Sequence, residues 1–311
     1  MEFIKKHSRT ILPFVGLFVV VAVLGIMSSG RLFAMANLNN ILDQSYTIVI
    51  LSVACTFLYS HGGFDLAVGG IYGISMMVSG LLLLSTGMNT WLALPMCIVV
   101  SLACYLIMCI VTVKLKLPAF ITSLCMQFIC RGIVTTISNG NINLPSEVSA
   151  ADNWIIKIVV LVVILAAAYI LLHRTAFGKK NCAIGENPVA ARQSGINIDK
   201  VRMAAYVITA IMVGVAGFFA MSSTRTVATL AGSGYEMDVI VAIVLGGMSL
   251  NGGMQSSVRA PIIGALIVVL LTNGLVIIGV PSTWSDFVIG VVFLIVILFT
   301  YKRNKLGLLP R

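Results

Sequence analysis

Charged residues are scarce in this sequence. They make up 10% of its 311 residues, whereas about 25% is usual for a soluble protein. Hydrophobic residues make up 59%, and several stretches of about 18 or more residues carry few or no charges, enough to cross a hydrocarbon core of about 30 Å. The composition excludes an ordinary soluble domain and predicts an all-α, polytopic membrane helix bundle.

The motifs of common catalysts are missing as well. There is no G-x-x-x-x-G-K-[ST] phosphate-binding loop, the three histidines are scattered at the ends of apolar segments, and the seven cysteines form no C-x-x-C pair. The sequence therefore gives no basis for a catalytic site, a metal site or a disulfide framework in this chain. Transport, a channel or a membrane scaffold remain as functions.

Basic residues are plentiful, but they do not form the kind of patch that binds nucleic acid. Apolar periodicity and helix breakers predict about ten transmembrane helices, over residues 11–29, 41–60, 66–86, 91–113, 118–138, 154–173, 201–223, 237–250, 260–279 and 283–301. With the N-terminus inside, sixteen Lys and Arg residues fall on inner segments and three on outer segments. This bias predicts a single membrane domain over 1–311 with both termini cytoplasmic.

One inner loop, residues 174–200, is long for a connection and has helix signals of its own. Asn187 is suited to an N-cap, Pro188 to the first helical position and Gly195 to the left-handed residue after the last turn. These signals predict a two-turn helix exposed to the cytoplasm, on which Ala190 and Ala191 form a smooth face. Such a face suits a groove on another protein, and an ordinary surface helix is the equally open alternative.

The segment HGGFDLAVGG, residues 61–70, places an acid and four glycines between apolar runs. It falls at the predicted inner turn between the second and third spans. Asp65 suits the N-cap of the third helix, where it would accept hydrogen bonds from amides near Val68. A role of Asp65 in gating a pathway is the alternative.

Polar residues inside the spans are the first candidates for function, because burying them in lipid is costly. Arg131 lies one turn after Gln127 and deep enough in a span to need a partner or a water-filled cavity. Glu236 and Asp238 fall near the outer end of a predicted span, where solvated helix ends are the simpler interpretation. The polar segment 222–238 is predicted to hold a short surface helix on the outer side.

The motifs together identify a family that the chain resembles. It resembles the membrane permease subunits of ribose-type ABC importers, which serve monosaccharides and related small solutes. The matching stretches occur in family order: Asn37–Leu42, Gly62–Gly69, Pro118–Ile121 with Arg131-Gly132, Phe177-Gly178 with Gly185–Ile196, Gly232–Asp238, Leu245–Gly253 and Asn273–Leu275.

The resemblance implies a complex in a bacterial plasma membrane. Its parts are a pair of permeases forming one pathway, two cytoplasmic ATPase subunits that carry ATP and Mg²⁺, and a soluble sugar-binding protein outside. It also implies that the segment 185–196 couples to the ATPases, through Gly185, Glu186, Asn187, Pro188, Ala190, Ala191 and Gly195. Glu236 and Asp238 are expected to meet basic residues of the binding protein.

A neutral sugar needs hydrogen bonds rather than ion pairs, so polar residues of the spans are expected to line or gate the pathway. They are Gln44, Thr47, Asp65, Thr122, Ser123, Gln127 and Arg131. For each hydroxyl, a bond back to its own helix is an equally open alternative.

After Gly252-Gly253 the sequence departs from the family pattern of further glycines, and only Gly264 is recovered. Because small residues set how closely membrane helices approach, this favours a non-identical second permease over an identical one. The alternatives for function are a permease of the same family for nucleosides, amino acids or a signalling sugar, an ion-coupled secondary transporter, and a scaffold without a pathway.

Overall fold

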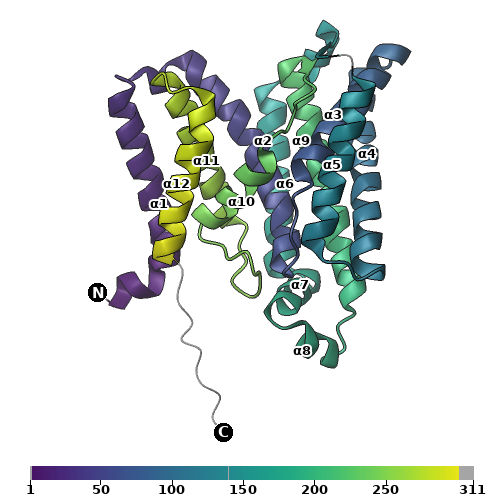
Figure 1. Cartoon of the computed structure of the whole chain (residues 1–311), viewed down its shortest axis with the longest axis vertical. Helices are drawn as coiled ribbons and strands as arrows, with labels where there is room; N and C mark the ends of the chain where they lie inside the picture. Colours follow the sequence, from purple (N-terminus) through teal and green to yellow (C-terminus); the bar gives the residue numbers. More distant parts are fainter. Residues whose placement is uncertain (1, 139, 301–311) are drawn as a thin grey trace.

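Long, roughly parallel helices make up the computed structural model, which describes residues 2–138 and 140–300 (Figure 1). The long helices are α1 (Glu2–Met27), α2 (Met35–Ser60), α3 (Val68–Thr86), α4 (Ala93–Cys109), α5 (Ala119–Ile137), α6 (Trp154–Tyr169), α9 (Ile198–Thr224), α11 (Arg259–Ile277) and α12 (Ser282–Thr300). The shorter elements are η1 (Arg31–Phe33), η2 (Thr90–Leu92), η3 (Ile110–Lys114), β1 (Ile142–Asn143), η4 (Ser146–Ala151), η5 (Ile170–Arg174), α7 (Ala176–Glu186), α8 (Pro188–Gln193), β2 (Thr226–Val227) and α10 (Tyr235–Leu245).

Seven of the described helices are long and apolar enough to cross a membrane: α2, α3, α4 with its flanking turns, α5, α6 with η5, α9 and α11. The prediction of an all-α, polytopic membrane bundle is confirmed. The start of α1 and the end of α12 lie at the same end of the bundle as α7 and α8 (Figure 1). The C-terminal basic residues in 302–311, which contributed to the predicted orientation, lie outside the described residues.

The centre of the bundle is α2, whose side chains from Ser45 to Ser60 are all buried. It packs against α9 and α11, and α9 packs in turn against α4. Small residues allow the α4–α9 approach: Gly214 lies against the backbone of Ile98, and the Ser101 hydroxyl donates to the Ala210 carbonyl at 2.7 Å. α6, in contrast, leaves most of its apolar surface exposed, as expected for a helix that faces lipid.

The predicted eighth span, 237–250, is wrong in its extent. α10 covers Tyr235–Leu245, 11 residues, and at 1.5 Å per residue it is about 16 Å long, roughly half of a hydrocarbon core. It ends where Gly246 packs on the carbonyl of Ala260, and Gly264 packs likewise on the carbonyl of Ala242. The two glycines bring α10 and α11 together so closely that a side chain at either position would overlap backbone atoms.

The short outer helix predicted within 222–238 is also wrong. Between the end of α9 at Thr224 and the start of α10 at Tyr235 lie β2 and a series of turns, and β2 pairs with β1 in a two-stranded antiparallel ladder, Ile142 opposite Val227. After β2 the chain descends from the end of α9 into the bundle, where α10 begins (Figure 1). Extended chain and a half-length helix therefore replace one of the predicted spans.

Candidate functional site

The third span begins inside the bundle rather than at its end. Residues 61–67 form a loop, and α3 begins at Val68 instead of the predicted residue 66. Asp65 in this loop is fully buried, and one of its carboxylate oxygens accepts from the Tyr105 hydroxyl of α4 at 2.7 Å. Tyr105 lies nine residues before Lys114 at the end of η3, about 13 Å along the helix.

Asp65 does help to start the third helix, although it is not the N-cap itself. The N-cap is Ala67, and Asp65 Oδ1 accepts from the Ala67 amide at 2.7 Å. Its Oδ2 also lies 3.7 Å from the Cys55 sulfur of α2. A single carboxylate thus ties α2, α4 and the start of α3 together, a role beyond the predicted local cap.

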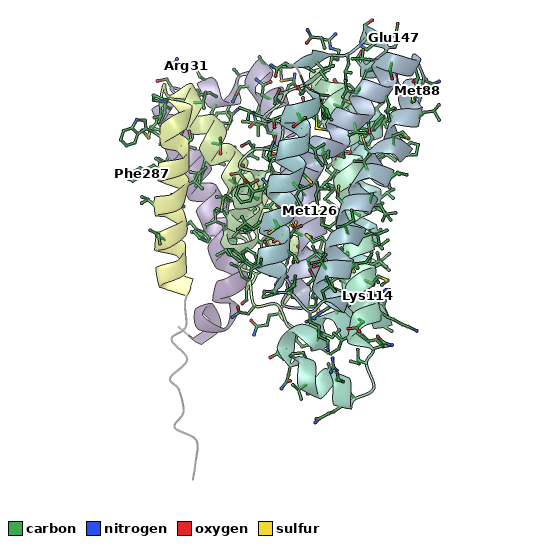
Figure 2. The ribbon with its side chains drawn as sticks, turned by 45° about the vertical axis from the view of Figure 1, so that its right-hand side comes forward. Arg31, Met88, Lys114, Met126, Glu147 and Phe287 are labelled. Atoms are coloured by element: carbon green, nitrogen blue, oxygen red, sulfur yellow. The ribbon has the colours of Figure 1, made fainter. Side chains whose placement is uncertain are left out.

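α10 begins next to the start of α3. The Ala231 carbonyl, just before α10, accepts from Arg131 Nη1 at 2.7 Å, and the Gly232 carbonyl lies against Gly69. Arg131 belongs to α5, one turn beyond Gln127. Met126, the neighbour of Gln127, lies between Lys114 and Met88, which mark the two ends of the spans (Figure 2).

Two helix N-termini therefore meet at mid-depth of the bundle. Free amides and the positive end of the helix dipole are concentrated at such termini. Membrane transporters commonly place their solute sites where helices are interrupted in this way. The arrangement defines a candidate site between the starts of α3 and α10.

Glycines on one face of α3 make room for polar groups at this site. Gly69 and Gly73, one turn apart, face the 231–236 segment, and a methyl group at Gly73 would lie 2.6 Å from the Ala231 oxygen. On the neighbouring face, Gln127 Oε1 accepts from the Gly70 amide at 2.6 Å. The rings of Tyr72 and Tyr235, one from each interrupted helix, lie 5.3 Å apart between centroids.

Two polar atoms at the site are buried without a hydrogen-bond partner among the described residues: Arg131 Nη2, a donor, and Glu236 Oε2, an acceptor. Both side chains lie along the glycine face of α3, with Glu236 against Gly69 and Arg131 beside Gly73. Leaving such an atom unpaired costs about 1–3 kcal/mol. A solute with hydroxyl groups could satisfy both, since a hydroxyl donates and accepts.

The structure brings only some of the predicted pathway residues to this site. Gln127 and Arg131 lie in it, and Thr47 is buried beside Tyr72, its hydroxyl 3.5 Å from the Asp43 carbonyl of its own helix. Gln44, one turn before Thr47 on α2, is exposed.

Thr122 and Ser123 lie near the start of α5, Ser123 one turn before Gln127, and both hydroxyls bond back to their own helix. Thr122 also bonds Thr112 at 2.8 Å. Both hydroxyls therefore show the bond back to their own helix that was the alternative to a pathway role.

Several residues of the site were not among the predicted pathway residues: Gly69, Gly73, Tyr72, Ala231 and Tyr235. A signal for two of them was present, because Gly69 and Gly73 form a G-x-x-x-G pattern, which favours close approach of another backbone. No local signal in the sequence identifies a carbonyl such as that of Ala231. Its place in the site depends on the path of the chain between β2 and α10.

The predicted helix in the loop 174–200 is confirmed as α8. Asn187 is its N-cap and accepts from the amides of Val189 and Ala190, Pro188 is its first residue, and Gly195 has φ of 79°. The exposed face was predicted incorrectly in one respect. Ala190 is exposed, whereas Ala191 is buried in a small apolar cluster with Ile184, Ile198 and Val201.

A multi-pass bundle with a polar site where two helices are interrupted defines a membrane transport permease. The chain belongs to the family described as branched-chain amino acid transport system / permease component, whose match covers residues 37–297. It is a multi-pass protein of the bacterial inner membrane.

Curated relatives cover almost the whole chain. The ribose import permease protein RbsC of Escherichia coli K12 is 30% identical over 309 residues, 93% of each chain. RbsC of Bacillus subtilis 168 is 30% identical over 302 residues, 94% of this chain and 92% of the relative. The autoinducer 2 import system permease protein LsrC of Photorhabdus luminescens is 28% identical over 94% of this chain and 90% of its own. No solved structure matches the chain.

Proposed function

We propose that this chain is the permease subunit of an ATP-driven importer for a monosaccharide, and that the sugar passes between the starts of α3 and α10. The observation that carries the proposal is a pair of buried atoms of opposite charge, Arg131 Nη2 and Glu236 Oε2, that have no hydrogen-bond partner among the described residues. A neutral polyol offers donors and acceptors to both. The names of the two RbsC relatives support ribose as the first solute to test.

In this proposal the energy comes from partner subunits. Two cytoplasmic ATPases bind ATP and Mg²⁺ and dock on α8, and a soluble binding protein delivers the sugar from outside. A second permease completes the pathway, and the departure of residues 254–261 from the family pattern favours a non-identical one. Since the ATPases dock on α8 from the cytoplasm, the proposal places the loop 174–200 and both termini on the cytoplasmic side.

The test uses the complex of this chain with its second permease, its ATPase and its binding protein, reconstituted into liposomes. We expect ATP-dependent uptake of radiolabelled ribose, and a fall of about tenfold or more in Glu236→Gln and Arg131→Gln, since each removes one side of a charged hydrogen bond worth about 1.5–3 kcal/mol. Ribose uptake by this chain alone would refute the proposal and favour an ion-coupled transporter.

The same variants separate a pathway role of Glu236 from binding-protein docking, which stays a prediction for Glu236 and Asp238. If Glu236 contacts the sugar, Glu236→Gln weakens uptake while the affinity of the complex for the binding protein is unchanged. If it docks the binding protein, the affinity falls in Glu236→Gln and falls further in the charge reversal Glu236→Lys with Asp238→Lys.

A further inference from the structure

Three backbone segments meet where α7 ends. They are the end of α2 with the first loop residues (Tyr59–Gly63), the end of α7 (Gly185–Glu186) and the loop after α10 (Gly252–Met254); we call this meeting point the glycine junction. The Gly253 amide donates to the Ser60 carbonyl at 3.0 Å, and the Met254 amide donates to Glu186 Oε2 at 3.1 Å. Each segment thus contacts the other two.

The glycine junction has no room for a side chain. A methyl group at Gly185 would overlap the Ser60 carbonyl and lie 2.6 Å from the Gly253 nitrogen. One at Gly252 would lie 2.6 Å from the Ser60 oxygen, and the φ of Gly252, 73°, disfavours any other residue. Contacts between backbones are stiffer than contacts through flexible side chains, so a displacement of α7 is passed on rather than absorbed.

A second attachment holds α7 to the start of the same loop. Asn181, one turn before Gly185, donates its amide to the Phe57 carbonyl at 2.8 Å, and its oxygen accepts from His61 Nδ1 at 3.1 Å. Because the Asn181 oxygen only accepts, His61 carries its proton on Nδ1. Asn181 is fully buried, so both bonds are shielded from water.

The two attachments lead to the two interrupted helices. From His61 the chain runs through Asp65 to the start of α3, and from Gly252 it runs back through Gly246 to α10. On the other side, α8 follows α7 directly, with Asn187 between them. Through α7, α8 is therefore connected to both walls of the candidate site by short lengths of chain.

We propose that α7 transmits movement of α8 to the starts of α3 and α10 by two separable branches, the Asn181 attachment and the glycine junction. The α3 branch runs through Asn181 and the α10 branch through Glu186. Gly185 and Glu186 then act as positioning residues that face the permease itself, rather than as contacts to the ATPase. The inference rests on the proposed function, since it takes the ATPase as the source of the movement.

The test measures amide hydrogen exchange in the permease–ATPase complex, with and without a non-hydrolysable ATP analogue. In the wild type we expect nucleotide to change exchange at residues 65–70 and at 231–238. Glu186→Ala should reduce the response at 231–238 at least severalfold more than at 65–70, and Asn181→Ala should do the reverse. Gly290→Ala, where a methyl group would meet nothing within 4 Å, is the control and should respond like the wild type.

Glu186 is exposed, so its variant is expected to fold even if Asn181→Ala does not. Unchanged responses in both branches of Glu186→Ala, or equal losses in both, would overturn the proposal, because a merely structural role predicts no selectivity. The readout does not involve the solute. Absence of ribose uptake by the wild type would refute the proposed function, while the exchange measurement would still decide on the glycine junction.

Discussion

The two helices that begin inside the bundle start in different ways. At the start of α3, Asp65 accepts from the Ala67 amide and Gln127 accepts from the Gly70 amide, and all four residues are buried. At the start of α10 the N-cap is Gly234, with φ of 86° and no side-chain cap bond.

Because of this difference, we expect a solute to affect the starts of the two helices differently. The Ala67 and Gly70 amides at the start of α3 are already satisfied by side chains of the protein, so we expect the solute itself to act little on them. The first turn of α10 instead includes the carboxylate oxygen of Glu236, which is buried without a hydrogen-bond partner among the described residues. Since an unpaired polar atom favours any ligand that satisfies it, we expect α10 to be the wall that responds to solute.

The largest expected effect comes from removing the support of α3. Asp65→Leu leaves the Ala67 amide and the Tyr105 hydroxyl buried without their acceptor, a cost of about 2–6 kcal/mol for the two groups. That is a large share of a typical stability of about 5–15 kcal/mol, so we expect little folded protein by size-exclusion chromatography in detergent.

Asp65→Asn should be milder, because the Asn oxygen can still accept from the Ala67 amide. Thermal melting and ribose uptake of the two variants make the comparison. Equal loss of uptake in a well-folded Asp65→Asn would instead assign a role to the charge itself.

A smaller effect is expected where the two helices touch. Gly69→Ala places a methyl group against the Gly232 carbonyl and the Glu236 carboxylate, and such overpacking costs about 1–3 kcal/mol. We expect the protein to fold and ribose uptake to fall about tenfold or more, since α10 must move away from α3. Uptake equal to that of Gly290→Ala would show that the close contact is not needed for transport.

The smallest effect is a dependence on pH at the α3 side. Burial, assisted by the nearby Arg202 cation, lowers the pKa of His61 to about 4 from the usual 6.5. As the pH falls, His61 therefore takes up its proton in the unfolded chain before it does so in the folded protein. The stability that neutral His61 contributes is complete above pH 6.5 and declines as the pH falls towards 4. When the pH is lowered from 7.5 to 5, the melting temperature of the wild type should fall by more than that of His61→Asn.

Local signals predicted α8 well and α10 poorly. Asn187, Pro188 and Gly195 act through their own backbone neighbourhood, so their positions in the sequence were sufficient. The apolar residues of 237–250 predicted a full span. The helix instead ends at its C-cap Gly246, which packs on Ala260, and a loop follows. Hydropathy measures how apolar a segment is, and it does not indicate where packing against another helix ends it.

The site shows the same division. Gln127 and Arg131 were identified because polar residues in an apolar span are rare, whereas Glu236 was assigned to the outer surface because it falls at the predicted outer end of the span 237–250. The structure places Glu236 against Gly69, which is 167 positions away in the sequence. Thr122 and Ser123, polar residues in the same span as Gln127, instead bond to their own helix.

The sequence by itself determined that the protein resides in the membrane and that the loop 174–200 carries a capped helix. Both follow from composition and from contacts within a few residues, which any compact fold preserves. Only the tertiary structure decided that Asp65 joins three helices, that α10 spans half the bundle, and that Arg131 and Glu236 lie along one face of α3. These features depend on glycines that let distant backbones meet, and such partners cannot be read from either segment alone.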